Sequence, residues 1–154
     1  MAIHPYLCYP AQRTNSHNGI LMGQETTARP DLPDLAGARV LLVEDEYYIA
    51  DDLRRLLDGA GASVVGPVST LAKAHKALDE DAFDCAVIDL NLHGESAIPI
   101  ADRLAQQGHS FAIATGYGSG SVPDRYKDVP RIEKPFDPRA LLQIMRQLSR
   151  ARES

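Results

Sequence analysis

The 154-residue chain has only two cysteines and no apolar run that approaches the roughly 20 residues a membrane-spanning helix needs. Cys8 lies in a polar leader and Cys85 in an apolar segment, so we expect two separate thiols in a reducing cytoplasm. The first 23 residues are broken by prolines and polar residues, unlike a signal peptide. We therefore expect neither export nor a membrane anchor.

The chain also lacks an excess of positive charge. Its 16 Lys and Arg residues are outnumbered by 21 Asp and Glu, which gives a net charge of −5. This balance argues against direct binding to nucleic acid or to an anionic membrane. Hydrophobic residues make up 44% of the chain, which is enough to build the core of one domain.

Composition divides the chain into a tail and one domain. Residues 1–36 carry repeated prolines and small polar residues without helical or strand periodicity, so we expect a disordered tail. Residues 37–150 should form the domain, and residues 151–154 a short C-terminal tail. We expect no output domain after them.

Apolar runs alternate with helical patterns along the domain. The apolar runs predict strands at 39–43, 62–68, 84–89, 111–115 and 129–133. Helical spacing predicts helices near 49–60, 70–79, 96–107 and 137–148, the second capped by Ser69 or Thr70. Residues 116–128 should be a loop with at most one or two helical turns after Pro123. This alternation predicts an α/β fold with a parallel sheet between two layers of helices.

Polar side chains follow four of the five predicted strands. The first strand is followed by Glu44 and Asp45, the third ends in Asp89, the fourth ends in Thr115, and the fifth precedes Lys134. Carboxyl ends of parallel strands meet at one edge of the sheet, so we expect these groups to share a pocket.

Three neighbouring carboxylates favour a hard divalent cation. Mg²⁺ would be bound directly by Asp45 and Asp89, through water by Glu44, and by the backbone carbonyl of Asn91. Asp89 would then be the nucleophile for a phosphoryl group. Lys134 and Thr115 would surround the phosphoryl oxygens, where negative charge accumulates.

This constellation resembles the receiver domain of bacterial two-component response regulators. The matching segments are Val43-Glu44-Asp45-Glu46, Val87-Ile88-Asp89-Leu90-Asn91, Ala114-Thr115-Gly116 and Lys134-Pro135-Phe136. The resemblance implies a flavodoxin-like fold with strand order 2-1-3-4-5 and a cis Lys134–Pro135 bond. It also implies a phosphoprotein that receives its phosphate from a histidine kinase or a histidine phosphotransfer protein.

A narrower resemblance is to the FATGUY group of single-domain receivers. It is carried by Phe-Ala-Ile-Ala-Thr-Gly-Tyr at 111–117, although Ile113 replaces a second Phe and Ser110 a frequent Pro. In receivers, Asn91 and Tyr117 occupy positions that tune the loss of phosphate. Arg131 stands where ordinary receivers carry an aromatic switch residue, so we expect phosphorylation to reorganise residues 116–128 instead.

The sequence thus predicts a stand-alone receiver that acts by binding a downstream protein or by draining phosphate from a kinase. It is not expected to be an enzyme beyond its own phosphorylation and dephosphorylation. One alternative is a receiver-like interaction module that needs no phosphate. The other is a Mg²⁺-dependent aspartyl-phosphate hydrolase, whose Asp-x-Asp motif would require an acid where this chain has Asn91.

Overall fold

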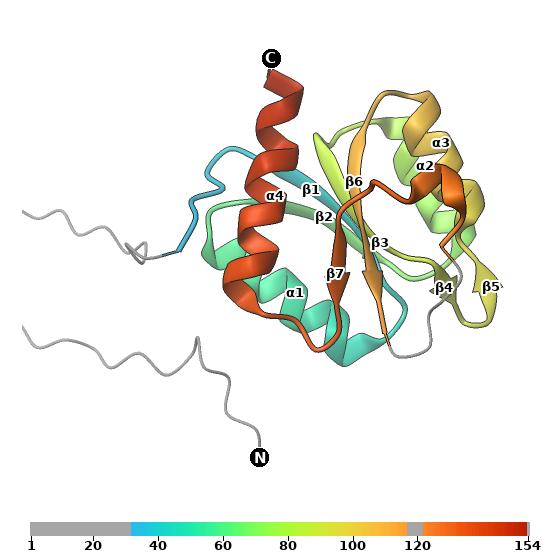
Figure 1. Ribbon diagram of the computed structural model, residues 1–154, viewed down its shortest axis with the longest axis horizontal. Helices are drawn as coiled ribbons and strands as arrows, with labels where there is room; N and C mark the ends of the chain where they lie inside the picture. The colour runs from blue at the N-terminus through green and yellow to red at the C-terminus, as the bar shows by residue number, and fades with distance from the viewer. Residues whose placement is uncertain (1–31, 117–121, 154) are drawn as a thin grey trace, which may run out of the picture.

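The structure, a computed structural model, describes residues 32–116 and 122–153, and the side chains of 32–116 and 122–151. A five-stranded parallel sheet lies between two layers of helices (Figure 1). Its strands, in the order β2-β1-β3-β6-β7, are β2 (Ser63–Val68), β1 (Arg39–Val43), β3 (Cys85–Asp89), β6 (Ser110–Thr115) and β7 (Arg131–Glu133). Since β6 and β7 are the fourth and fifth strands of this sheet, the expected flavodoxin-like order is confirmed.

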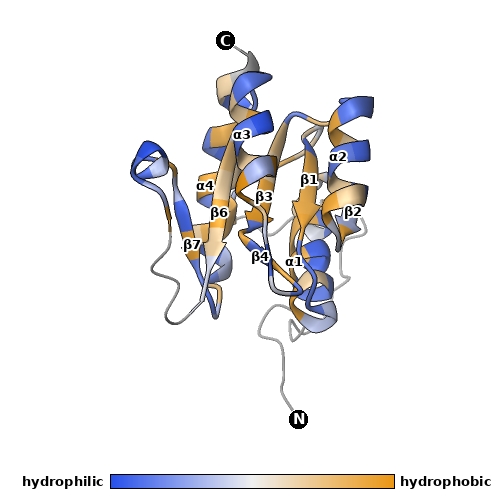
Figure 2. Cartoon of the chain, turned by 90° about the vertical axis from the view of Figure 1, so that its right-hand side faces the viewer, coloured by the Kyte–Doolittle hydropathy of each residue, from blue (hydrophilic) through white to orange (hydrophobic). Residues whose placement is uncertain are grey.

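Each face of the sheet is covered by a pair of helices. Helices α1 (Tyr47–Gly59) and α4 (Pro138–Glu153) share one hydrophobic core with the sheet, and α2 (Leu71–Glu80) and α3 (Ile98–Gln106) share the other. Figure 2 shows the hydrophobic colour concentrated on the strands and the hydrophilic colour on the outer helix surfaces. None of the described helices combines the length and the apolar character that a membrane crossing requires.

Burial on both faces explains the unbroken apolar runs. Along β1, Val40 and Leu42 belong to the core under α1 and α4, whereas Leu41 and Val43 belong to the opposite core. All four side chains are 0% exposed. Successive side chains of a strand point to opposite faces, so a central parallel strand needs apolar residues at every position.

The chain between β3 and α3 folds differently from the prediction. Strands β4 (Asn91–Leu92) and β5 (Glu95–Ser96) form an antiparallel hairpin, joined by His93 and Gly94 with φ of +52° and +85°. Two positive φ angles are what a tight two-residue hairpin turn requires. Because the hairpin uses Ser96, α3 begins at Ile98, and the Ser96 hydroxyl accepts a hydrogen bond from the Ile98 N–H at 3.2 Å.

Packing against the core begins before the predicted boundary at residue 37. Leu35 is 2% exposed, and its N–H donates to the Ala60 carbonyl at the end of α1 at 2.8 Å. Leu32 also packs against this core. The rest of the predicted tail, residues 1–31, lies outside the described residues. Among the two candidate caps of α2, the structure selects Thr70, whose hydroxyl accepts from the Lys73 N–H at 3.1 Å.

Between β6 and β7, the described residues contain one short 3₁₀ helix, η2 (Asp124–Tyr126). This agrees with the expected loop carrying at most one or two helical turns after Pro123. The Tyr126 ring packs edge-on against Phe111, and its hydroxyl donates to Asp102 of α3. Arg125 donates to the same carboxylate at 3.0 Å. The later part of this segment is therefore attached to α3.

Candidate functional site

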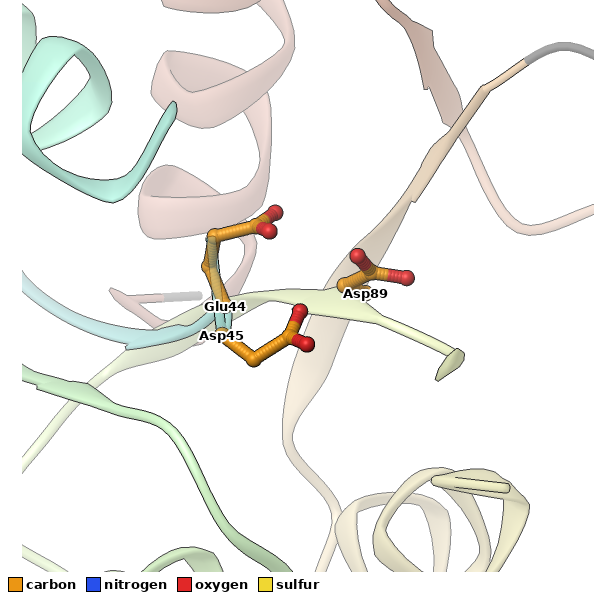
Figure 3. A group of neighbouring side chains, drawn as sticks. All are labelled: Glu44, Asp45 and Asp89. Carbon is orange, nitrogen blue, oxygen red and sulfur yellow. The ribbon is translucent and has the colours of Figure 1, made fainter. Parts of the chain in front are cut away.

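Three carboxylates meet at the carboxyl edge of the sheet. Strands β1 and β3 are parallel neighbours with Val43 paired to Ile88, so the residues that follow them leave the sheet side by side. Carboxylate oxygens of Glu44, Asp45 and Asp89 all lie within 4.8 Å of one another (Figure 3). The structure therefore brings together the three acids that the sequence placed at these strand ends.

Lys134 supplies a positive charge to this cluster. Its Nζ donates to Asp89 Oδ2 at 2.9 Å and lies 3.1 Å from Glu44 Oε1. The Lys134 N–H donates to the Thr115 carbonyl at 2.8 Å, which holds the lysine beside the end of β6. The following bond to Pro135 is cis, as the resemblance implied. Burial by itself would lower the pKa of Lys134, but the hydrogen bond to Asp89 and the charges of both acids outweigh burial and raise it.

Glu44 is the most deeply placed of the acids. Its side chain is 1% exposed, and Oε2 accepts a hydrogen bond from the Glu46 N–H at 3.1 Å. Oε1 faces Lys134 as an ion pair but accepts no hydrogen bond among the described residues. Burial, reinforced by the charge of Asp89, raises the pKa of Glu44 to about 7. Glu44 is thus a buried carboxylate with spare acceptor capacity.

This pKa predicts a pH-dependent stability of the metal-free protein. A carboxyl group whose pKa is higher in the folded than in the unfolded chain opposes folding as the pH rises from its ordinary value of 4.5 to its folded value of about 7. We expect the free energy of unfolding of the wild type to fall over this interval, relative to Glu44→Gln, by roughly 2–3 kcal/mol.

Urea unfolding in chelator-containing buffer at several pH values measures this difference. The matched control is Glu46→Gln, which makes the same substitution at an exposed neighbouring residue. Its free energy of unfolding should show the same pH dependence as that of the wild type. Parallel pH profiles for wild type and Glu44→Gln would contradict the prediction.

The hairpin after β3 is hydrogen-bonded to two of the acids. Asp89 Oδ1 accepts from the Asn91 N–H, and Asp45 Oδ2 accepts from the His93 N–H, both at 2.9 Å. The Asn91 side-chain oxygen in turn accepts from the Gly94 N–H at 2.9 Å. The hairpin therefore positions the carboxylates of both strands.

Sequence reasoning missed the contribution of His93. A lone loop histidine is typical of solvated surface, and its side chain is indeed 62% exposed. Its backbone N–H, however, contacts Asp45, and its Nδ1 lies 3.4 Å from the same oxygen. The signal that could have revealed this is the glycine at position 94, because a polar residue followed by glycine favours a two-residue hairpin turn.

The remaining predicted residues are placed less centrally. Thr115 is partly buried at the end of β6, one residue beyond Ala114, the β6 partner of Asp89. Arg131 is exposed on β7, where it pairs with Ile113. Tyr117 lies outside the described residues. The structure thus places Thr115 at the same edge as the acids.

The donor set fits a hard divalent cation. All three carboxylates offer oxygen atoms, which Mg²⁺ prefers, and Lys134 offsets part of their mutual repulsion through its ion pairs with Glu44 and Asp89. The Glu44 oxygen without a hydrogen bond is a further acceptor at this edge.

Comparison with known proteins gives one consistent match. A family model described as the response regulator receiver domain matches residues 40–146, a range that contains every residue of the acid cluster and Lys134. The solution structure of SdrG from Sphingomonas melonis Fr1 is 35% identical, with 72% of this chain and 95% of that chain covered and a TM-score of 0.67.

The BeF₃-activated conformation of SdrG, from Pseudomonas melonis Fr1, is also 35% identical, with 74% of this chain and 98% of that chain covered and a TM-score of 0.63. The sensory transduction protein LytT of Bacillus subtilis is 29% identical over 112 residues, or 70% of this chain. The chain spans about half the length of the curated relatives it matches, 46% for LytT. The narrower FATGUY resemblance stays a prediction.

Proposed function

Because this chain belongs to the response regulator receiver family, we propose that it is a phosphorelay switch whose Asp89 accepts a phosphoryl group. The observation that carries the proposal is the group formed by Lys134 and the three carboxylates at one sheet edge. This arrangement combines a nucleophilic oxygen with the cation that a developing phosphoryl charge requires.

In the proposed step, an oxygen of Asp89 attacks the phosphorus of a phosphohistidine on a kinase or a phosphotransfer protein. The oxygen–phosphorus bond forms as the nitrogen–phosphorus bond breaks, and the leaving imidazole nitrogen keeps the electron pair and takes a proton from solvent. Lys134 already contacts Asp89 Oδ2 at 2.9 Å, so its ammonium is in place to stabilise charge on the transferring group.

A magnesium ion would be held by Asp45, Asp89 and the backbone carbonyl of Asn91, with Glu44 acting through water. When bound, Mg²⁺ offsets the negative charge that otherwise keeps a phosphoryl donor away from carboxylates. The hairpin contributes by fixing Asp45 and Asp89 through backbone N–H groups, which leaves other carboxylate lone pairs available. Thr115 would donate its hydroxyl to a phosphoryl oxygen.

The output we propose is phosphorylation-dependent binding of a downstream protein, or removal of phosphate from a kinase, in the cytoplasm. The match to 95% of the solved SdrG chain supports a receiver domain of this size. A phosphate-independent module would instead bind its partner equally well as wild type and as Asp89→Asn.

A small phosphodonor tests the proposal directly. Wild type incubated with phosphoramidate and Mg²⁺ should gain the mass of one phosphoryl group, which hydroxylamine should remove because an aspartyl phosphate is an acyl phosphate. A chelator should prevent the gain. The proposal would be overturned if the folded protein gained no mass while another receiver, treated in parallel as a positive control, was phosphorylated.

We further propose that phosphorylation acts on residues 116–128, since Arg131 lies exposed on β7 in place of the aromatic switch residue. Tyr126 and Arg125 attach the end of this segment to Asp102 of α3, so changes at Asp89 would concentrate between Thr115 and that attachment. We expect amide hydrogen exchange in 116–128 to change at least about threefold with BeF₃⁻ and Mg²⁺, and exchange in α2 to stay constant. Unchanged exchange in the segment would exclude this output route.

A further inference from the structure

A groove of about 600 Å³ runs along the outer surface of α4. Leu32 and Pro33 form one wall of this arginine groove. The other wall is α4, which contributes the side chains of Arg139, Gln143, Arg146, Gln147 and Arg150. Figure 1 shows the segment after residue 31 passing beside α4 on the side away from β7.

The spacing along α4 explains why these side chains line one groove. The three arginines lie seven and four residues apart, which places them on one stripe of the helix. The stripe of Leu141, Leu142 and Met145, all 0% exposed, faces the core instead. At about 1.5 Å of rise per residue, the arginine stripe is about 16 Å long.

Arg146 and Arg150 differ from most other described arginines in their ion pairing. Most arginines elsewhere in the described part pair with an acid, as Arg39 does with Asp84 and Arg103 with Asp79. No ion pair of Arg146 or Arg150 is found among the residues that the structure describes. Within the part of the chain that the structure describes, no acidic side chain lines the groove. An acidic chain thus carries a concentrated basic groove.

A second hollow of about 480 Å³ adjoins the groove and shares Arg146 and Arg150 with it. Its two acids are already engaged: Asp84 pairs with Arg39, and Asp34 accepts a hydrogen bond from the Ala36 N–H at 2.9 Å. The basic surface therefore continues past the segment at 32–34 toward the start of β1.

We propose that the arginine groove binds an extended acidic segment of a protein partner. Guanidinium groups bind carboxylates through paired hydrogen bonds, and the two glutamines offer amide groups to a peptide backbone. A length of about 16 Å matches about five residues of extended chain. A long nucleic-acid polyanion would also meet the rest of a chain whose net charge is −5, whereas a short acidic segment contacts the groove alone.

The groove is separate from the acid cluster around Asp89. The adjoining hollow includes Arg39, the first residue of β1, and Asp84, just before β3, whereas Asp89 is the last residue of β3. The adjoining hollow thus lies toward the opposite edge of the sheet from Asp89, and none of the residues that line the groove belongs to the acid cluster. A partner held in the arginine groove would leave Asp89 accessible, so the inference goes beyond the proposed phosphoryl transfer and does not rest on it.

Fluorescence anisotropy with a labelled hexapeptide of alternating Glu and Asp tests the proposal in the full chain at low salt. We expect binding that weakens at least tenfold in Arg146→Glu/Arg150→Glu. The matched control is Lys73→Glu/Lys76→Glu, which makes the same charge change on exposed positions of α2 and should bind like wild type. A Gln/Asn analogue of the peptide should not bind.

Equal weakening in both double variants, or no binding by wild type, would overturn the proposal. Preferential competition by a short DNA duplex would overturn it in favour of nucleic acid. Chemical shifts of residues 1–31 that change in Arg146→Glu/Arg150→Glu without peptide would assign the groove to this chain's own segment instead. Phosphorylation of Asp89 in the arginine variant should remain normal, which separates this test from that of the proposed function.

Discussion

Replacing Asp89 with alanine is expected to abolish acceptance of a phosphoryl group. The rate of mass gain from phosphoramidate with Mg²⁺ should fall at least about a hundredfold, because no other carboxylate of the cluster has the same surroundings. Glu44 is buried, and Asp45 has no ion pair with Lys134 among the described residues, whereas Asp89 accepts a hydrogen bond from Lys134. Intact-mass measurement over time gives the rate.

Asp128→Ala is the matched control for this substitution. Asp128 is exposed in the segment before β7. The Asp128→Ala variant should therefore gain a phosphoryl group at the wild-type rate. The Asp89→Ala variant should still fold, because Lys134 keeps its ion pair with Glu44. The substitution also removes one of three carboxylates that repel one another. A variant that folds and still gains one phosphoryl group would refute Asp89 as the acceptor.

Replacing Lys134 with methionine is expected to slow phosphorylation about 10²–10³-fold, comparable to the loss of one donor to a developing oxyanion. Methionine keeps much of the side-chain volume and removes the charge that faces Asp89 at 2.9 Å and Glu44 at 3.1 Å. The acids would then repel one another without a protein cation. We therefore also expect a shift of Mg²⁺ binding toward higher affinity, measured by calorimetry.

The control is Lys127→Met, at an exposed position beside η2. It should change neither the phosphorylation rate nor the affinity for Mg²⁺. If Lys134→Met were phosphorylated as fast as wild type, the lysine would serve only to neutralise the acids before the reaction. An unchanged Mg²⁺ affinity would contradict the repulsion argument while leaving the acceptor role of Asp89 intact.

The sheet and its acid cluster could be predicted from sequence because one constraint produces both. Strands buried on two faces must be apolar at each position, so the first polar residue marks the point where the chain leaves the sheet. Val43 and Ile88 are buried, and the residues after them carry the carboxylates. Lys134 was placed only by its position directly after β7, an edge strand whose Arg131 and Glu133 are exposed.

The parts that were missed depend on contacts between segments that carry no periodic signal. Two-residue strands such as β4 and β5 are too short to show alternation. Leu35, after several prolines, is buried in the core under α1 and α4, and its N–H donates to the Ala60 carbonyl. The arginine groove likewise arises where Leu32 and Pro33 pass beside α4.

The β4–β5 hairpin has a consequence for how the surface of this domain tolerates change. Exposed turns usually accept insertions, because few contacts depend on their length. Here two backbone amides of one hairpin, those of Asn91 and His93, donate to Asp89 at the end of β3 and to Asp45 just after β1. An added residue at His93–Gly94 would alter the separation of those two carboxylates even though the turn itself faces solvent.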